Sequence, residues 1–544
     1  MDTPSCFVND DTSNQSEDRV AGEASRIAIV GAGIAGLSAA LELAHAGEDV
    51  LVLDAHGAPG GKMRTVPSAA GPIDAGPTVF TMRHVFEELL DSVGETLSGE
   101  LGLNRSAILA RHEWRGGATL DLHANRAESI DAVAAFANGD EARRFAAFCE
   151  RCDLLFDSFD APMMRAPAPS PLSVTRTVMS NAVRLTRAMA PMSTMWSALG
   201  RQFGDQRLRQ LFARYATYVG GSPLLSPALL MLIWASEERG VWHVEGGMHA
   251  LARMLERLAT ARGAQFRYGA CASRILADKN GITGVELEGG ERIAARTVLF
   301  NGDPGALSGG LLGPAVSGAA PRLDRADRSL SAWVWTWATP TGGFPLAHHT
   351  VFFGGSSETE FDDLFTGRRT PRDPTLYICA QDRGGAAPDG PERLLMIMNA
   401  PADGDIHTPA PQEIAACQST VFTRLSEAGL TLIPPERTAL TTPDRFAALF
   451  PGTGGALYGA NPHGRMKAFA RPTARTAITG LYLCGGGCHP GPGVPMAALS
   501  GRHAAAAITQ DRASTSRSIP VAMRGGISTG SAMTASTASP SSAS

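Results

Sequence analysis

A glycine-rich turn between a short apolar strand and a helix limits what this chain can fold into. The stretch RIAIVGAGIAGLSAALELAHAGEDVLVLDA opens at Arg26, and Gly31, Gly33 and Gly36 have the spacing G-x-G-x-x-G. The first glycine permits a tight turn, the second lets a pyrophosphate approach the backbone, and the third lets the helix pack on the strand. The pattern predicts a strand–helix–strand unit that binds a dinucleotide at the helix N-terminus.

The second strand of this unit ends in an acidic residue. Apolar residues from Val50 to Leu53 precede Asp54. A carboxylate at the end of this strand can accept hydrogen bonds from ribose hydroxyls. We therefore predict that Asp54 binds the cofactor together with the glycine turn and the first helical residues, Ile34 and Ala35.

A second glycine motif, Gly60-Gly61-Lys62-x-Arg64-Thr65, follows directly. It resembles the R-x-G-G-R-x-x-S/T element of the FAD-binding amine oxidase and carotenoid desaturase superfamily, in which the glycines admit the diphosphate and the basic residues neutralise it. The chain departs from this element at Ala58, where an arginine often stands, and at Lys62, where arginine is commoner. A lysine still serves phosphate as a point charge. The resemblance implies that the dinucleotide is FAD.

The C-terminal stretch LYLCGGGCHPGPGVPMAALSG, which begins at Leu481, changes from an apolar strand to a rigid turn and then to a helix. It resembles the C-terminal signature of carotenoid desaturases, in which the helix N-terminus faces the pyrimidine end of the flavin. The resemblance implies that the amides of Met496 and Ala497 stabilise negative charge on the reduced ring. His489 is a candidate acid or base, although a structural hydrogen bond is the competing interpretation.

The resemblance also implies a set of further cofactor contacts. Ala272 stands where the superfamily usually has a valine whose backbone meets the adenine. The turn before the last helix contributes Gly485, Gly487, Gly493, Val494, Pro495 and Met496. We expect no metal site.

Long stretches in the middle of the chain narrow the family. ARYATYVGGSP and VWHVEGGMHALA are similar to the corresponding parts of bacterial 1-hydroxycarotenoid 3,4-desaturases, also called methoxyneurosporene desaturases, and the similarity extends from about Arg26 to about Ala507. It implies an FAD-dependent desaturase that introduces a C3–C4 double bond into long acyclic 1-hydroxycarotenoids such as 1-hydroxyneurosporene, by hydride transfer to flavin N5. Such enzymes serve spheroidene- and spirilloxanthin-type carotenoid biosynthesis in photosynthetic bacteria, and oxygen or a quinone would be the final electron acceptor.

Four other functions are compatible with the glycine motifs. A phytoene-type desaturase, a carotenoid isomerase and an amine oxidase share the expected fold. A carrier of prenylated proteins, as in GDP-dissociation inhibitors, is the non-enzymatic alternative, and such carriers lack a working flavin site. Bound flavin in the visible spectrum would separate the enzymes from the carrier.

The chain reads as an α/β protein with a discontinuous Rossmann-like domain. We expect residues 25–95, 235–310 and 470–508 to form the FAD-binding domain, because strand and turn signals recur there. Residues 96–234 and 311–469 would form an inserted α+β substrate domain. The polar stretches 1–24 and 509–544 are predicted to be disordered tails.

Composition and charge bear on partners and location. The net charge of −5 gives no basic surplus for nucleic acid. Eight scattered cysteines suggest a reducing cytoplasm, and no apolar run approaches the ~18 residues of a membrane span. We expect a cytoplasmic protein that binds the inner or photosynthetic membrane peripherally through the segment Ala161 to Phe203, where Met and Arg alternate with apolar residues. An ordinary insertion with a solvated basic face is the alternative.

Overall fold

A five-stranded parallel sheet collects strands from both ends of the chain. The computed structural model describes residues 26–180, 182–384, 388–435, 439–464 and 466–517. In this sheet β1 pairs with β13 on one side and with β2 on the other, with Ile27 opposite Thr297 and Val50. In spatial order the strands are β21 (Leu481–Leu483), β13 (Thr297–Phe300), β1 (Ile27–Val30), β2 (Val50–Asp54) and β9 (Gln265–Tyr268).

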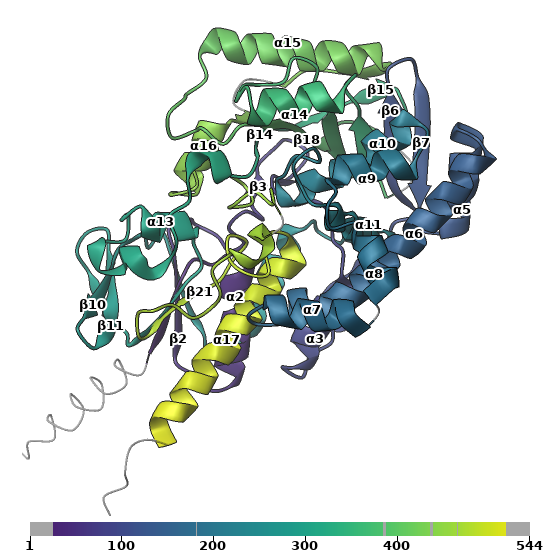
Figure 1. The fold of residues 1–544 in the computed structure, drawn as a ribbon. Helices are drawn as coiled ribbons and strands as arrows, with labels where there is room; N and C mark the ends of the chain where they lie inside the picture. Colours follow the sequence, from purple (N-terminus) through teal and green to yellow (C-terminus); the bar gives the residue numbers. More distant parts are fainter. Residues whose placement is uncertain (1–25, 181, 385–387, 436–438, 465, 518–544) are drawn as a thin grey trace, which may run out of the picture.

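Two helices from opposite ends of the chain pack beside this sheet. Helix α2 (Ile34–His45) follows the first glycine turn, and α17 (Val494–Arg517) lies alongside it in Figure 1, where α17 is yellow. Their close approach requires Gly501, because a Cβ there would lie 2.0 Å from the carbonyl oxygen of Ala35. The third glycine of the turn, Gly36, is required for the same reason, since its Cβ would lie 2.2 Å from the carbonyl oxygen of Gly31.

Helix α17 is longer than the sequence predicts. The disordered tail was expected from residue 509, and this is wrong for residues 509–517, which are helical. Asp511 accepts hydrogen bonds from Arg475 and from the hydroxyl of Tyr482, which lies on strand β21. These bonds attach the last turns of the helix to the sheet. The predicted tails 1–24 and 518–544 lie outside the described residues.

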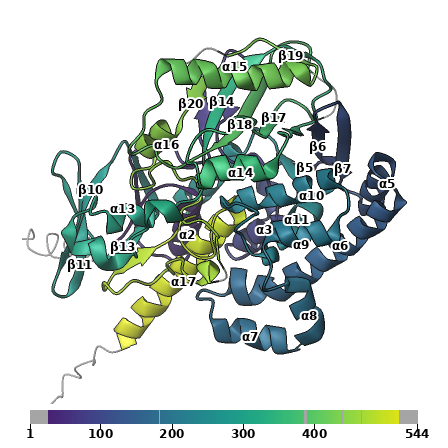
Figure 2. The same cartoon turned by 45° about the horizontal axis from the view of Figure 1, so that its top comes forward.

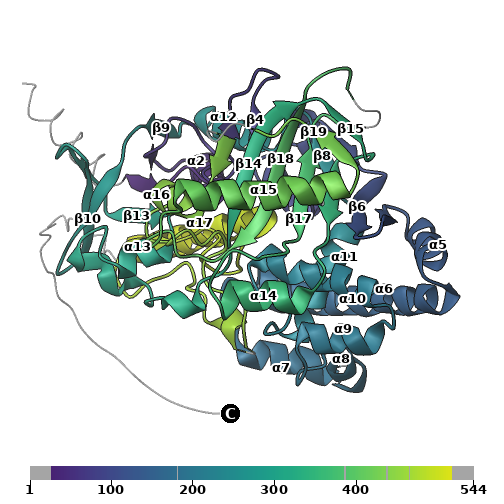
Figure 3. The same cartoon turned by 90° about the horizontal axis from the view of Figure 1, so that it is seen from above.

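A seven-stranded mixed sheet forms the second layer and separates a packed face from a cavity face. In β14, the alternating residues Trp333, Trp335 and Trp337 pack against helix α15 (Pro411–Glu427), while Ala332 and Val334 point to the other side. Figure 3 shows α15 lying across the sheet. The strand order is β20 (Leu440–Thr441), β14 (Ser331–Thr339), β18 (Glu392–Ala400), β17 (Leu376–Ala380), β16 (His349–Phe352), β6 (Ile108–Trp114) and β7 (Ala118–His123).

Four smaller sheets complete the β-structure. They are β10 (Ala272–Asp278), β11 (Gly281–Leu287) and β12 (Arg292–Ala294); β3 (Thr65–Val66) with β4 (Ile73–Asp74); β5 (Leu103–Arg105) with β8 (Trp242–Val244); and β15 (Thr341–Gly343) with β19 (Leu430–Leu432).

Helices between the two large sheets and along one flank make the rest of the fold (Figures 1 and 2). Aromatic side chains hold the flank together, since Phe148 and Trp234 both contact the ring of Phe212. The α-helices not yet named are α3 (Arg83–Asp91), α4 (Leu97–Glu100), α5 (Arg126–Phe136), α6 (Gly139–Phe159), α7 (Pro171–Ser180), α8 (Ala182–Met189), α9 (Met195–Gln202), α10 (Gln206–Ala213), α11 (Ile233–Glu238), α12 (His249–Thr260), α13 (Pro304–Ser308), α14 (Ser357–Phe365) and α16 (Pro443–Leu449). Short 3-10 turns include η2 (Arg214–Val219) and η3 (Ala228–Leu232).

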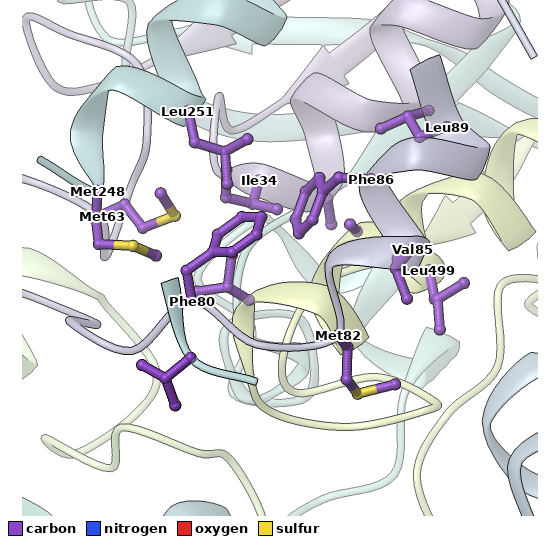
Figure 4. Close-up of a cluster of buried hydrophobic side chains, with 14 of the residues drawn as sticks. Ile34, Met63, Phe80, Met82, Val85, Phe86, Leu89, Met248, Leu251 and Leu499 are labelled. Carbon is purple, nitrogen blue, oxygen red and sulfur yellow. The ribbon is translucent and has the colours of Figure 1, made fainter. Parts of the chain in front are cut away.

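The largest hydrophobic core lies where α2, α3, α12 and α17 meet. Figure 4 shows side chains from these helices gathered around Ile34, with Phe80 and Phe86 close to it. All three side chains are buried. This core fixes the first turn of α2, and therefore the glycine turn before it, in one position.

Candidate functional site: a cofactor cradle that opens into an apolar cavity

A cavity of about 1140 Å³ runs between the parallel sheet and the mixed sheet. This volume exceeds the roughly 300–1,000 Å³ of an ordinary small-ligand pocket. Of the predicted cofactor-binding residues, Gly36 does not line the cavity, and it serves the packing of α2 on the strand instead. Those that line it are Gly31, Gly33, Ile34, Ala35, Asp54, Gly60, Gly61, Lys62, Arg64, Ala272, Gly485, Gly487, Gly493, Val494, Pro495 and Met496.

The two glycine motifs lie next to each other at one end of the cavity. Gly33 and Gly60 form an isolated parallel bridge. A Cβ at Gly61 would lie 3.2 Å from the Cα of Gly33, and Gly61 has a φ of +58°. Glycine therefore keeps the backbone of both turns bare where the pyrophosphate is predicted to bind.

Asn301 completes this end of the cavity and was missed in the sequence. It lies directly after β13 and donates hydrogen bonds from Nδ2 to the carbonyl oxygens of Gly31 (2.9 Å) and Gly33 (3.3 Å). The sequence does contain a signal for Asn301, because it directly follows an apolar strand and the carboxyl ends of parallel strands meet at one edge of a sheet. Recognising 297–300 as a parallel strand would have placed Asn301 beside the glycine turn.

Asp54 lies at the end of β2, is buried, and holds the surrounding backbone. Its Oδ2 accepts a hydrogen bond from the amide of Ala32 at 2.6 Å, and its Oδ1 accepts one from the amide of His56 at 2.7 Å. Oδ1 also lies 3.1 Å from Nδ1 of His56, whereas Oδ2 can accept a second bond. The side chain therefore supports the turn and retains the capacity to bind a ribose hydroxyl.

Three partly buried charged groups, Lys62, Asp303 and Arg471, line the cavity. Lys62 donates from Nζ to the carbonyl oxygen of Leu457 at 2.6 Å, and burial lowers its pKa while the charge of Asp303 opposes this. Burial likewise raises the pKa of Asp303 and lowers that of Arg471 to about 10. Asp303 and Arg471 were not predicted, since they come from parts of the sequence without a recognisable motif.

The basic residue Arg64 carries an unsatisfied donor. Its guanidinium donates from one terminal nitrogen to the hydroxyl of Thr441, but its buried Nε has no hydrogen-bond partner among the described residues. An unpaired buried donor on a cavity wall fits a ligand with acceptor atoms.

Ala272, the predicted adenine contact, begins β10. It lies close to Ala270, whose amide donates a hydrogen bond to the carbonyl oxygen of Asp54.

The N-terminus of α17 differs in detail from the expectation. The helix begins at Val494, and the amide of Ala497 donates to the carbonyl oxygen of Gly493 at 2.8 Å. The predicted role of the Ala497 amide is therefore wrong, because the helix itself uses this donor. Val494 and Met496, which precede it in the first turn, line the cavity, and the helix dipole favours negative charge at this end.

His489 lines the cavity but its ring is engaged elsewhere. Nε2 donates to the carbonyl oxygen of Ala166 at 2.7 Å, and burial lowers the pKa of the ring. A neutral ring fixed by this bond connects the C-terminal turn to the segment before α7. This geometry favours the structural interpretation of His489.

One group of possible metal ligands occurs among the described residues. The ligand atoms of His348, His349 and Cys379 lie within 4.8 Å of one another. All three side chains already have partners, since Nδ1 of His349 lies 2.7 Å from the hydroxyl of Tyr377 and Nε2 of His348 lies 3.4 Å from Sγ of Cys379.

The walls beyond the cradle are mostly apolar. They come from the cavity face of the mixed sheet and from the helical flank. Among the residues that form them are Phe156, Phe159, Met163, Met164, Val174, Met189, Leu229, Leu230, Leu232, Ile233, Val334, Phe353, Leu395 and Ile397. The bare glycine turns, the basic side chains of Lys62 and Arg471 and the unpaired donor of Arg64 fit a flavin dinucleotide, and the apolar walls leave room for a second, hydrophobic molecule.

Comparison with known proteins agrees with this arrangement. The profile of the family "Flavin containing amine oxidoreductase" matches residues 34–509. Hydroxyneurosporene desaturase of Cereibacter sphaeroides is 50% identical over 90% of this chain and 99% of its own length, and that of Rubrivivax gelatinosus is 47% identical over 94% and 98%. A solved structure of putrescine oxidase has a TM-score of 0.55 at 16% identity and covers 90% of this chain and 99% of its own, which supports the fold alone. The chain belongs to the family of flavin-containing amine oxidoreductases, and FAD is its cofactor.

Proposed function

We propose that this protein is an FAD-dependent desaturase that introduces the C3–C4 double bond into long acyclic 1-hydroxycarotenoids such as 1-hydroxyneurosporene, in carotenoid biosynthesis. The observation that carries the proposal is the single cavity that joins the glycine cradle to apolar walls. The names of the two desaturases that cover nearly the whole chain support the choice of substrate. In this proposal residues 25–95, 235–310 and 470–508 hold the cofactor, and residues 96–234 and 311–469 receive the substrate.

The reaction removes a hydride and a proton from neighbouring carbons, and a new double bond forms in conjugation with the polyene. Bound FAD supplies the oxidant, since its flavin accepts the hydride. The protein contributes position, because the apolar walls hold a long hydrocarbon against the cradle. Arg471, with a pKa of about 10, keeps positive charge at the end of the cavity where the cofactor is proposed to bind, and Lys62 is a second basic group there.

A membrane supplies such a substrate, and one face of the protein is suited to it. Among the described residues, no helix is both long and apolar enough to cross a bilayer. Leu172, Met179, Val183 and Met192 are nevertheless 75%, 70%, 86% and 76% exposed on and just after α7 and α8. We call this surface the α7–α8 face; the helices lie at the lower edge of the molecule in Figure 2.

Charge and cavity access favour a lipid surface as the partner of the α7–α8 face. Residues 171–192 contain three arginines and no acidic residue. Val174 and Met189, from the same two helices, line the cavity. We propose that the face rests on a bilayer and that the carotenoid enters the cavity beside it.

The desaturase proposal is tested with the purified holoprotein and carotenoids in liposomes under oxygen-free conditions. 1-Hydroxyneurosporene should bleach the visible flavin absorbance and give a product with one more conjugated double bond, seen as a red-shifted spectrum. Phytoene and putrescine should react poorly. A comparable rate with phytoene would identify a phytoene-type desaturase, reaction with putrescine alone would identify an amine oxidase, and a protein that purifies without flavin would contradict the proposal.

A further inference from the structure

Glu360 is a buried carboxyl group on the cavity wall that has no countercharge. It lies on α14, is 3% exposed and lines the cavity. Oε1 accepts a hydrogen bond from the amide of Thr375 at 3.0 Å, and Oε2 accepts one from the hydroxyl of Thr375 at 2.7 Å. No ion pair joins Glu360 to a basic side chain in the part of the chain that the structure describes.

Other buried carboxyl groups of the same domain are paired. Glu392 lies 2.8 Å from the guanidinium of Arg383, and Glu113 forms an ion pair with Arg424. On the cavity wall, Glu237 accepts hydrogen bonds from the hydroxyls of two tyrosines, and burial raises its pKa while the nearby charge of Arg214 opposes the rise. A buried carboxylate without a cation is costly unless hydrogen bonds satisfy it. Glu360 is therefore an exception that needs a physical explanation.

The ionisation of Glu360 reflects the same cost. Its pKa is raised to about 7, because burial raises it, the two bonds from Thr375 oppose part of the rise, and the charge of Asp373 adds a smaller increase. A carboxylate offers about four acceptor positions, and the protein fills two of them. The remaining positions can be filled by a donor inside the cavity.

The surroundings of Glu360 indicate what kind of donor this is. Nearby walls are apolar, including Phe353 and Phe361, and suit a hydrocarbon. Gln210, the adjacent amide, is already used, since it donates to the carbonyl of Gly354 and accepts from the indole of Trp114. Helix α14 lies beside α10 in Figures 2 and 3. Glu360 thus offers open acceptor positions and no countercharge on a largely apolar wall, which matches a hydrocarbon that carries one hydroxyl group.

We infer that Glu360 accepts a hydrogen bond from the 1-hydroxyl of the carotenoid, with Thr375 holding the carboxylate in place. The inference rests on the proposed function. The hydroxyl on C1 lies two carbons from C3, so a fixed position for the hydroxyl sets which bond meets the cofactor. A hydrocarbon without the hydroxyl leaves the remaining acceptor positions of Glu360 unfilled. This cost separates hydroxylated from non-hydroxylated carotenoids far more strongly than contacts with the apolar walls do.

The test compares two substrates with four forms of the holoprotein. 1-Hydroxyneurosporene and neurosporene, which lacks the hydroxyl, are supplied in matched liposomes to the wild type, Glu360→Leu, Glu360→Gln and Asp362→Asn. Asp362 is an exposed carboxyl group on the same helix and provides the control. Both kcat/KM and the dissociation constant from tryptophan fluorescence quenching are measured, with flavin content and Tm to verify folding.

The Glu360→Leu variant should lose about 10–100-fold in kcat/KM and in affinity for the hydroxylated substrate, as expected for a hydrogen bond to a charged group. With neurosporene, the kcat/KM and the affinity of Glu360→Leu should stay within about threefold of the wild type. The control variant Asp362→Asn should stay within the same limit with either substrate. Glu360→Gln, which keeps the shape of the side chain, should show a smaller loss with the same selectivity. Equal losses on both substrates, or none, would overturn the inference.

Failure of the proposed function gives a different result. If the wild type desaturates neither substrate, the desaturase proposal fails, and the dissociation constants still decide the role of Glu360. In that case a wild-type preference for the hydroxylated carotenoid that Glu360→Leu abolishes would support the inference. No preference in the wild type would overturn it.

Discussion

The side chain of Asn301 donates a hydrogen bond from Nδ2 to the carbonyl oxygen of Gly31 at 2.9 Å, across 270 residues of sequence. The bond joins the carboxyl ends of two parallel strands, β13 and β1, and fixes the backbone of the glycine turn. Asn301→Asp removes the donor and places negative charge beside the predicted diphosphate site. We expect the dissociation constant for FAD to rise about tenfold or more.

Flavin fluorescence during reconstitution of the apoprotein measures this change. Asn280→Asp, in an exposed turn, is the control and should bind FAD like the wild type. Unchanged affinity in Asn301→Asp would show that the turn keeps its shape without this bond.

Asp54→Ala should weaken FAD binding by about 1.5–3 kcal/mol, because it removes an acceptor for ribose and the anchor of the Ala32 amide. Asp54→Asn keeps an oxygen that can accept the bond from the Ala32 amide, so its loss of FAD binding should be smaller. Flavin retained after dialysis measures both effects. If Asp54→Ala retains flavin as tightly as the parent, the assignment of Asp54 is wrong.

The buried pair of Arg424 and Glu113 connects α15 to β6 and should stabilise the mixed sheet. Arg424→Met leaves a buried carboxylate unpaired, so we expect a loss of about 3–5 kcal/mol in the free energy of unfolding. The double variant Glu113→Leu/Arg424→Met should recover most of it. The exposed Arg115 pairs with Asp373 and Glu427, and Arg115→Met should cost less than about 1 kcal/mol in the same denaturation experiment.

The α7–α8 face should determine membrane binding. Leu172→Ser/Val183→Ser removes two exposed apolar side chains and should lower partitioning onto liposomes about tenfold or more, with little change in Tm. Ile406→Ser/Ile433→Ser removes two other exposed residues, which are 62% and 66% exposed, and serves as the control. Equal co-sedimentation of both variants with liposomes would place the contact on another surface.

Stability should fall as Glu360 is forced to ionise. Its pKa of about 7 in the folded protein exceeds the ordinary value of 4.5, so the folded state holds this proton more tightly than the unfolded chain. The resulting stabilisation is present below 4.5 and is lost as the pH rises through about 7. Relative to the wild type, the Tm of Glu360→Gln should therefore rise between about pH 5 and about pH 8. A constant difference in Tm across this range would contradict the raised pKa.

The sequence by itself determined the cofactor end of the protein. Gly31 has a φ of +108° and a Cβ at Gly36 would lie 2.2 Å from the carbonyl oxygen of Gly31, so both positions require glycine, and Asp54 follows from the end of the next strand. The dinucleotide-binding unit follows from this local pattern, because backbone geometry over a few residues fixes it. The choice of FAD and of the family came instead from the resemblance of longer stretches to known flavoproteins. The extension of α17 to Arg517 escaped this reasoning, since bonds from Arg475 and Tyr482 to Asp511 connect it to a distant strand.

Only the tertiary structure decided the chemistry of the cavity. Lys62 contacts Leu457, Asn301 contacts Gly31, and Glu360 is buried without a cation because segments far apart in sequence pack together. The sequence shows that a residue is charged but not which charges surround it. Burial and countercharge set the cost and the reactivity of an ionisable group, and both depend on the packed structure alone.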